Sequence, residues 1–274
     1  MQEGEREAIE VDLLLEAIFR AYAYDFRGYA SASLRRRLWR RAALEGVDNL
    51  SGLQERILHD PSCLDRLLAD LSINVTEMFR DPGFHLALRE RVMPVLHTYP
   101  FVRVWIAGCS TGEELYSVAI ALREEGLLER ARLYATDMND TVLSRARAGS
   151  FPLERLARYT RNYLDAGGRQ EFSSYYRVDG DQAVFDPTLV RNVVFAQHNL
   201  AMDGSFNEFQ LIVCRNVMIY FGKPLQDRVL QLFDDSLASL GVLALGHKET
   251  ISRTVLEPRY EALVGAERIY RRTA

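Results

Sequence analysis

The sequence has little cysteine, no excess of basic residues and no long uncharged stretch. Its three cysteines, Cys63, Cys109 and Cys214, lie far apart and form no Cys-x-x-Cys pair, so neither a disulfide framework nor a zinc site is indicated. The formal net charge of −4 argues against general nucleic-acid binding, which needs a basic surface. No stretch approaches the roughly 20 apolar residues of a membrane-spanning helix, and the acidic amino-terminal segment does not resemble a secretory signal. We therefore expect a cytoplasmic protein without membrane insertion or a metal site.

What is present is enough apolar sequence for a large core and a small accessory domain, since 48% of the 274 residues are hydrophobic. Helical periodicity recurs over four segments near the amino terminus: residues 11–24, 33–44, 50–58 and 62–71. Asp81-Pro82-Gly83 then interrupts the pattern, and a further helix is expected over residues 84–96. We predict an amino-terminal helical domain over residues 1–80 and a second domain over residues 81–274.

The second domain alternates short apolar runs with helix-length amphipathic segments, which is typical of a parallel sheet covered on both faces. The expected strands are residues 102–107, 132–136, 209–214 and 241–246, and the expected helices are residues 113–124, 140–148 and 223–240. Two short β-like runs flank Asp179-Gly180, a strong hairpin signal. We therefore predict an α/β fold with a Rossmann-like sheet and a small antiparallel insert at about residues 170–190.

The expected first strand runs into a glycine-containing turn, Gly108 to Gly112, and Glu113-Glu114 follow at the start of a helix. In an open α/β sheet this corner lies where ligands bind. The glycines allow a tight turn and close approach of a ligand, but an ordinary βα turn is the alternative interpretation. The spacing is not Gly-x-Gly-x-x-Gly, and two carboxylates stand where a pyrophosphate would bind. The pattern therefore disfavours a dinucleotide and, with it, a nicotinamide oxidoreductase.

Asp137 ends the next expected strand, where a carboxylate can accept hydrogen bonds from both ribose hydroxyls. S-adenosylmethionine has a ribose, no phosphate and two cationic groups, so an acidic pocket suits it. We therefore predict S-adenosylmethionine as the cofactor, with S-adenosylhomocysteine as its product. The alternative is that Glu114 is a helix-terminal charge and Asp137 a solvated strand end.

Four segments carry a resemblance to a known family: NVTEMFR at 74–80, AGCSTGEELYSVAI at 107–120, ATDMND at 135–140 and CRNVMIYF at 214–221. Together they resemble the chemotaxis receptor glutamate methyltransferases of the CheR type, over nearly the whole chain and in the family's order. Met78 departs from the usual aromatic residue and Leu115 from the usual proline. Both positions suggest packing and helix entry, so the resemblance is little affected.

The resemblance implies a class I methyltransferase that esterifies glutamate side chains of a chemoreceptor, for adaptation in chemosensory signalling. The cofactor-binding residues that it implies are Asn74, Thr76, Arg80, Gly108, Glu114, Asp137, Asn199, Leu200, Arg215 and Asn216. Glu114 would hold the amino group of the cofactor and Asp137 its ribose. Asn199 and Leu200 would contact the adenine, and Arg215 with Asn216 would line the methyl-transfer end. Asn74, Thr76 and Arg80 would close over the cofactor.

The resemblance also implies catalytic roles for Arg80 and Tyr220. A methyl group on a sulfonium is already activated, and a glutamate carboxylate with a pKa of about 4.3 is ionised near neutral pH, so no general base is required. The enzyme must align the carboxylate and exclude water. Arg80 and Tyr220 can each donate a hydrogen bond to the carboxylate, which suits them to position it. Aromatic core packing is the alternative interpretation of Tyr220.

Four arginines form the densest charge cluster in the sequence: Arg36, Arg37, Arg40 and Arg41. On a helix they share one face, opposite Leu34, Leu38 and Ala42. We expect this face to dock the acidic helical region of a chemoreceptor-like protein, with a merely solvated face as the alternative. The enzyme itself is expected to be a monomer. A different class of function, a sensor or scaffold that binds the cofactor without turnover, stays open, although Arg80 and Tyr220 argue against it.

The predicted insert bears on a second mode of receptor recognition. In some members of the family the equivalent β excursion binds a tether peptide at the carboxyl end of the receptor. Here the turn is the acidic Asp179-Gly180-Asp181, which would repel a terminal carboxylate. We therefore expect a tether-independent enzyme whose insert is structural, with Tyr175, Tyr176 and Phe185 packed against the sheet.

Overall fold

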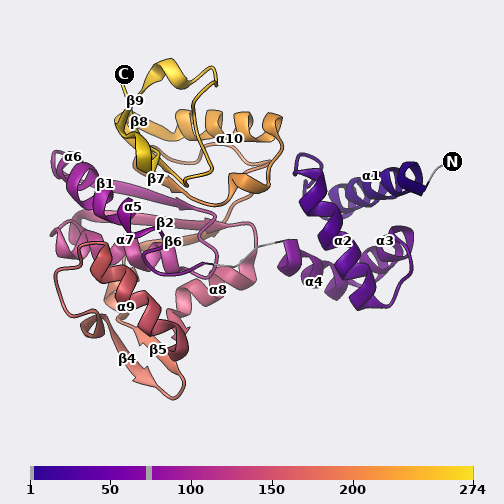
Figure 1. The fold of residues 1–274 in the computed structure, drawn as a ribbon, viewed down its shortest axis with the longest axis horizontal. Coiled ribbons are helices and arrows are strands. Elements are labelled where there is room, and N and C mark those ends of the chain that lie inside the picture. The colour runs from indigo at the N-terminus through magenta and orange to yellow at the C-terminus, as the bar shows by residue number, and fades with distance from the viewer. Residues whose placement is uncertain (1–2, 72–75, 274) are drawn as a thin grey trace. The chain divides into compact units, whose positions relative to one another are not determined.

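The computed structural model describes residues 3–71 and 76–273, which fall into two compact units (Figure 1). The helical unit comprises the described residues up to 71, together with 200–203 and 220–229. The larger unit comprises residues 76–199, 204–219 and 230–273. Residues 76–80, which we expected in the helical domain, belong to the larger unit, where Phe79 is fully buried and donates its backbone N–H to Ser117 Oγ. Within the described residues, no helix is both long and apolar enough to span a membrane.

The helical unit contains the four expected helices, α1 (Glu3–Tyr22), α2 (Ser31–Glu45), α3 (Leu50–His59) and α4 (Pro61–Leu71). Each buries one apolar stripe, and the stripes together form a core that includes Leu14, Ile18, Leu38, Leu53 and Leu67, all fully buried. Helix α3 begins after Asn49, whose side chain accepts a hydrogen bond from the backbone N–H of Gly52 at 2.8 Å. Helix α1 begins earlier than the periodicity predicted.

A segment from late in the sequence completes this unit. The backbone N–H of Ala30 donates to the carbonyl of Tyr220 at 2.8 Å, and the N–H of Gly222 donates to the carbonyl of Gly28 at 2.7 Å. The rings of Tyr29 and Phe221 meet edge to face with their centroids 5.0 Å apart. Tyr220 is therefore held by the connection between α1 and α2, a pairing that the order of the sequence does not indicate.

The larger unit is built on a seven-stranded sheet in the order β6-β2-β1-β7-β8-β10-β9. Its strands are β1 (Val102–Ala107), β2 (Ala131–Asp137), β6 (Val193–Gln197), β7 (Phe209–Cys214), β8 (Leu237–Leu245), β9 (Tyr260–Val264) and β10 (Ile269–Arg272). The first five strands of that order pair in parallel, and β10 is antiparallel to both β8 and β9. The predicted Rossmann-like sheet is confirmed, although we had not predicted the last two strands.

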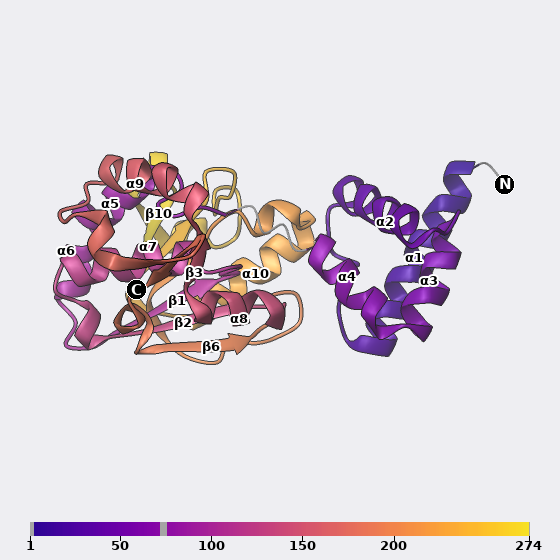
Figure 2. The same ribbon diagram turned by 90° about the horizontal axis from the view of Figure 1, so that it is seen from below.

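Helices cover both faces of this sheet (Figures 1 and 2). They are α5 (Pro82–Ala87), a π-helical turn (Leu88–Val92), α6 (Met93–His97), α7 (Glu113–Glu124), α8 (Asp140–Ala148), α9 (Leu156–Asp165) and α10 (Lys223–Ser236). Val104 of β1 packs in the same core as Val118 of α7, while Trp105 meets the ring of Phe233 of α10 at 5.3 Å. This alternation is what the period of two along a strand requires. Helix α10 ends earlier than predicted, because β8 begins at Leu237.

The insert is confirmed as a three-stranded antiparallel sheet of β3 (Ser150–Pro152), β5 (Gln182–Phe185) and β4 (Tyr176–Asp179), in that order. Gly180 makes the hairpin turn with φ of 61°. Phe185 is buried, and its ring lies 5.5 Å from that of Tyr116 on α7. Tyr175 is also buried and Tyr176 is half-buried, so aromatic packing anchors the insert to the larger unit.

Candidate functional site

The turn after β1 depends on its two glycines. Gly108 has φ of +70°, and a Cβ there would lie 2.5 Å from a methyl carbon of Val217. Gly112 has φ of +100°, and a Cβ there would lie 2.9 Å from the Cβ of Ala146 on α8. Both the backbone conformation and the lack of space therefore require glycine. The turn brings the start of α7 close to the end of β2, as the sequence predicted for a ligand-binding corner.

Asp137 at the end of β2 is tied to this turn. Its Oδ2 accepts the backbone N–H of Ser110 at 3.0 Å, and its Oδ1 accepts the N–H of Asn139 at 3.1 Å. Burial raises the pKa of the Asp137 carboxyl above its ordinary value, while these N–H groups oppose the rise. A carboxylate oxygen can accept more than one hydrogen bond, so both oxygens of Asp137 retain capacity for a ribose hydroxyl.

The adjacent glutamates of α7 have different environments. Glu113 is 1% exposed, and its Oε2 accepts a hydrogen bond from Thr111 Oγ1 at 2.6 Å. Its Oε1 lies 3.5 Å from Arg155 and 3.4 Å from the hydroxyl of Tyr159. Burial raises the pKa of the Glu113 carboxyl. With both oxygens engaged inside the fold, Glu113 stabilises the turn and α9.

Glu114 offers one open oxygen instead. Its Oε2 accepts a hydrogen bond from Arg215 Nη1 at 2.8 Å, whereas its Oε1 is buried and has no hydrogen-bond partner among the described residues. His85 Nε2 lies 3.6 Å from Oε1, but burial lowers the pKa of His85 well below its ordinary value, so the imidazole is neutral. Burial also raises the pKa of Glu114, with Arg215 opposing. A buried, unpartnered carboxylate oxygen fits the ammonium group of S-adenosylmethionine.

Arg215, directly after β7, is fixed on several sides. Its Nη2 donates to Asp81 Oδ2 at 2.7 Å and to the carbonyl of Arg80 at 3.1 Å. Its guanidinium carbon lies 3.9 Å from the ring centroid of Phe84. Arg215 therefore joins the end of β7 to the segment before α5 and to Glu114, and holds the backbone of Arg80 in place.

Glu249 is a site-forming residue that our sequence analysis missed. It is 4% exposed, and its carboxylate accepts the backbone N–H groups of Asn216, Val217 and Met218 at 2.7 to 2.9 Å, and that of Gly246 at 2.7 Å. Asn216 has φ of 60°, so this carboxylate stabilises an uncommon backbone conformation. An acidic residue after an expected strand, the signal that identified Asp137, was present here too.

Two further predicted residues line a cavity of about 550 Å³ in the larger unit. Thr76 and Arg80 form part of its wall, together with residues at the start of α9. The charge of Arg80 also acts on Glu114, where it favours the carboxylate. Asn74, predicted to close over the cofactor, lies outside the described residues. Leu200 and Tyr220 belong to the helical unit, whereas Asn199 and Asn216 belong to the larger unit.

The arginine cluster of α2 is not one exposed face. Arg36 and Arg40 are exposed, but Arg37 and Arg41 are buried. Arg37 donates to the carbonyl of Leu71 at 2.7 Å, and Arg41 binds Asp70 and Glu45. The predicted docking face is therefore corrected to Arg36 and Arg40, because positions three residues after a buried leucine lie close to the core.

Arg37 has a second contact, with the predicted catalytic tyrosine. Its guanidinium carbon lies 4.9 Å from the ring centroid of Tyr220 within the helical unit. Together with the hydrogen bond from Ala30 to the Tyr220 carbonyl, this contact fixes the orientation of Tyr220 within the helical unit.

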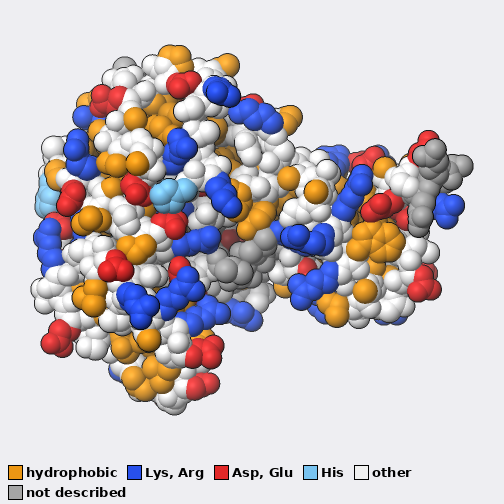
Figure 3. Space-filling model, in the orientation of Figure 1, with side chains coloured by type: hydrophobic (Ala, Val, Ile, Leu, Met, Phe, Trp, Pro, Cys, Tyr) orange, Lys and Arg blue, Asp and Glu red, His pale blue; other side chains and the backbone are white. Residues whose placement is uncertain are grey.

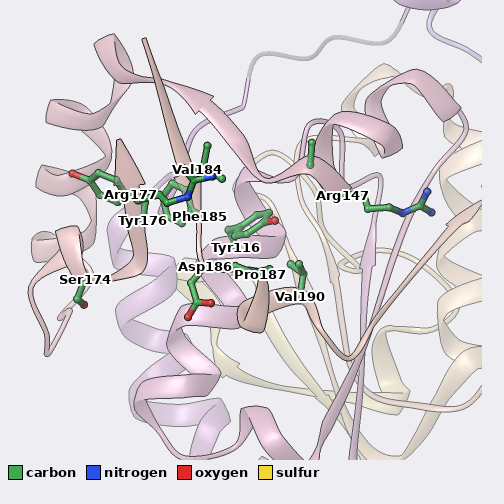
Figure 4. A pocket seen from close by; sticks show the side chains of 11 residues that line it. Tyr116, Arg147, Ser174, Tyr176, Arg177, Val184, Phe185, Asp186, Pro187 and Val190 are labelled. Carbon is green, nitrogen blue, oxygen red and sulfur yellow. The ribbon is translucent and has the colours of Figure 1, made fainter. Parts of the chain in front are cut away.

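A second cavity, of about 430 Å³, lies beside the insert (Figure 4). Tyr116 and Phe185 line it, and Arg147 and Arg177 also contribute to its wall. None of its lining residues belongs to the predicted site, so this cavity is separate from the strand ends described above.

Comparison with known proteins relates this chain to one family. A model described as the SAM binding domain of CheR methyltransferase matches residues 74–263, and a model described as the all-alpha domain of CheR methyltransferase matches residues 9–72. A Pseudomonas putida protein described as a methyltransferase, Cher3, is 51% identical over 267 residues, which cover 97% of each chain. The chemotaxis protein methyltransferases of Listeria innocua and Salmonella typhimurium are 34% and 33% identical, covering 70% and 68% of this chain and 71% and 64% of theirs.

Proposed function

Because the chain belongs to the CheR methyltransferase family, we propose that it methylates glutamate side-chain carboxylates of a chemoreceptor with S-adenosylmethionine, giving glutamate methyl esters and S-adenosylhomocysteine. The observation that carries the proposal is the buried open oxygen of Glu114 beside the end of β1. With Asp137 at the neighbouring strand end, it forms an acidic pair suited to a cofactor with a ribose and an ammonium group.

Different residues of the larger unit would bind different groups of the cofactor. Glu114 Oε1 accepts from the ammonium group, and Asp137 accepts from the ribose hydroxyls. Gly108 and Gly112 give the turn beside the ligand its shape, since a Cβ at either position would clash with Val217 or Ala146. Thr76 and Arg80 line the neighbouring cavity, and Asn199 follows β6.

The bound cofactor supplies a methyl group already activated by its sulfonium. The chain's own residues must then align a carboxylate that is ionised without a general base, because the pKa of glutamate is about 4.3. Arg80 and Tyr220 donate hydrogen bonds to that carboxylate and restrict its orientation. Arg215 fixes the backbone of Arg80, and Arg37 orients the ring of Tyr220. Both are positioning residues.

The chemistry is tested by the linkage that forms. The chain, radiolabelled S-adenosylmethionine and a cytoplasmic chemoreceptor fragment should give labelled receptor whose label is released as methanol by mild alkali. Tyr220→Phe should lower incorporation, because one donor to the carboxylate is lost, while affinity for S-adenosylhomocysteine changes little. Label that survives alkali would contradict a carboxyl methyl ester. Cofactor binding with no incorporation into any fragment would instead support a sensor or scaffold.

We also propose that Arg36 and Arg40 dock the glutamate-rich helical region of the receptor. Reversing both to Glu should slow methylation and flatten its salt dependence, because exposed charges are screened over about 10 Å at 0.1 M salt. Arg20→Glu, an exposed change on α1, is the matched control. A wild-type rate indifferent to salt would contradict electrostatic docking.

Receptor recognition is proposed to need no tail peptide. Asp179 and Asp181 flank the exposed turn of the insert and would repel a terminal carboxylate. Receptor with and without its last few residues should be methylated at equal rates. A large drop on truncation would contradict this.

A further inference from the structure

The cavity next to Arg80 has four charged wall residues that lie outside the predicted cofactor site: Glu77, Glu154, Arg155 and Arg158. We call it the α9 cavity; its lining residues are Thr76, Glu77, Arg80, Glu154, Arg155, Arg158 and Tyr159. Three of these side chains are arginines and two are glutamates, so its walls carry a net positive charge. Lys and Arg side chains also gather on the visible face over α9 (Figure 3).

Of the two arginines that α9 and its entry contribute, Arg158 is the more accessible. Arg158 pairs with Glu77, but its side chain is 72% exposed. Arg155 lies 3.5 Å from the buried Glu113 and is 46% exposed. Turning Arg155 away would leave the buried carboxylate of Glu113 without its cation, which is costly, whereas the mostly exposed Arg158 loses little when its ion pair opens. The guanidinium of Arg158 can therefore turn toward an incoming carboxylate at low cost, and a guanidinium can bind a carboxylate through two hydrogen bonds.

Arg80 belongs both to this wall and to the pair that we propose orients the reacting glutamate. A helical substrate presents side chains three or four residues apart as neighbours, about 5–6 Å from one another. A glutamate-rich helix that places one carboxylate at Arg80 therefore brings another within reach of the α9 cavity. The cavity volume of about 550 Å³ leaves room for that second side chain.

We propose that the α9 cavity is a specificity subsite for a second carboxylate of the substrate helix, beside the glutamate that is methylated. This inference rests on the proposed function. Arg158 is the main residue that binds the second carboxylate. Glu77 competes with that carboxylate, because it pairs with Arg158 when no substrate is bound. The enzyme thus selects glutamates that have an acidic neighbour on the same helical face.

Because Arg158 and Glu77 carry opposite charges, replacing one should lower the preference for an acidic neighbour and replacing the other should raise it. Receptor fragments with one methylatable glutamate are prepared in two forms, with Glu or Gln at the neighbouring position. The wild-type enzyme should prefer the Glu form by about three- to fivefold in kcat/KM, the size expected of one exposed ion pair. Arg158→Gln should abolish this preference, whereas Glu77→Gln should increase it. Arg161→Gln, on the exposed side of α9 and outside the cavity, should leave both the preference and kcat unchanged.

Binding of S-adenosylhomocysteine, unchanged in all three variants, shows that each is folded. Equal rates of the wild-type enzyme on both fragments would overturn the subsite while leaving the methyltransferase function intact. A preference that persists in Arg158→Gln, or that Glu77→Gln fails to increase, would also overturn it. If the wild-type enzyme methylates neither fragment, the proposed function fails, and the subsite with it.

Discussion

The loop after β1 (residues 108–112) and the loop after β7 (residues 215–218) both leave the carboxyl ends of parallel strands, but they are stabilised differently. The first owes its shape to its own glycines and to Asp137 on the adjacent strand. The second takes its shape from Glu249, whose carboxylate accepts three successive N–H groups of the loop. One loop is encoded locally, and the other depends on a side chain more than 30 residues away.

This difference determines what a mutation should do to each loop. A loop whose shape comes from its own glycines is destabilised when a substitution strains its backbone conformation. A loop whose N–H groups bind a carboxylate far away in the sequence is destabilised when that buried acceptor is lost, even though the loop's own sequence is unchanged. The hydrogen bond between Arg215 and Glu114 connects the two loops, so a change in the shape of one loop should also affect the other.

The largest effect is expected at Gly112. Gly112→Ala should lower the free energy of unfolding by about 2–5 kcal/mol, because it combines a strained positive φ with a steric clash against α8. Gly126→Ala is the matched control, since Gly126 has φ of +69° but no atom within 4 Å of the position that a Cβ would take. Denaturant unfolding measures both variants. Equal losses would contradict the importance of the contact with Ala146.

The next effect tests the loop after β7. Glu249→Gln should lower the free energy of unfolding by about 2–4 kcal/mol, because its amide can replace only one carboxylate oxygen and leaves buried N–H groups without an acceptor. The rate of methyl transfer should fall further than cofactor affinity does. Lys248→Gln, at an exposed neighbour, is the control for both measurements. A Glu249→Gln enzyme with normal stability and rate would remove the distinction between the two loops.

The same distinction explains how much of the fold the sequence predicted. Strands β1 and β7 were predicted to the residue, because each is a short apolar run between polar segments, interrupted only by Arg103 in β1 and Gln210 in β7. Strands β9 and β10 were missed, because no residue of β9 is fully buried and the apolar signal is weak. The end of α10 was misplaced because Leu237 and Ala238 continue an apolar helical pattern, yet they begin β8.

The site follows the same division. The glycine turn and Asp137 could be predicted, because the residues that shape them stand at strand ends in the sequence. The role of Glu249, the pairing of Arg215 with Glu114 and the burial of Arg37 could not be predicted from spacing. Each depends on a contact between segments far apart in the chain, which periodicity and local motifs do not report.

A smaller effect is expected at Asp137, which binds the loop after β1. Asp137→Ala should weaken binding of S-adenosylhomocysteine by about 1–3 kcal/mol, because two ribose hydroxyls and the N–H groups of Ser110 and Asn139 lose a charged acceptor. Asp140→Ala, at an exposed carboxylate nearby, is the control. Calorimetry measures both affinities. Unchanged affinity in the Asp137 variant would contradict the assignment of the pocket.

The smallest effect is expected at Glu114, where the two loops meet. Glu114→Gln should weaken cofactor binding by about 1 kcal/mol, because a charge-assisted hydrogen bond to the ammonium group becomes a neutral one. Glu113→Gln should leave affinity closer to the wild-type value, since both oxygens of Glu113 bind within the fold.

The pH dependence of that affinity separates Glu114 from its neighbours. Burial raises the pKa of Glu114, with Arg215 opposing, and the ammonium group binds the carboxylate form. Affinity should therefore be full above the pKa of Glu114 in the free enzyme and fall as the pH is lowered through it, starting at a higher pH than for an ordinary glutamate. Asp137 titrates in both proteins, so the ratio of wild-type to Glu114→Gln affinity isolates Glu114. That ratio should shrink toward one at low pH, and a ratio independent of pH would show that the open oxygen does not bind the cofactor.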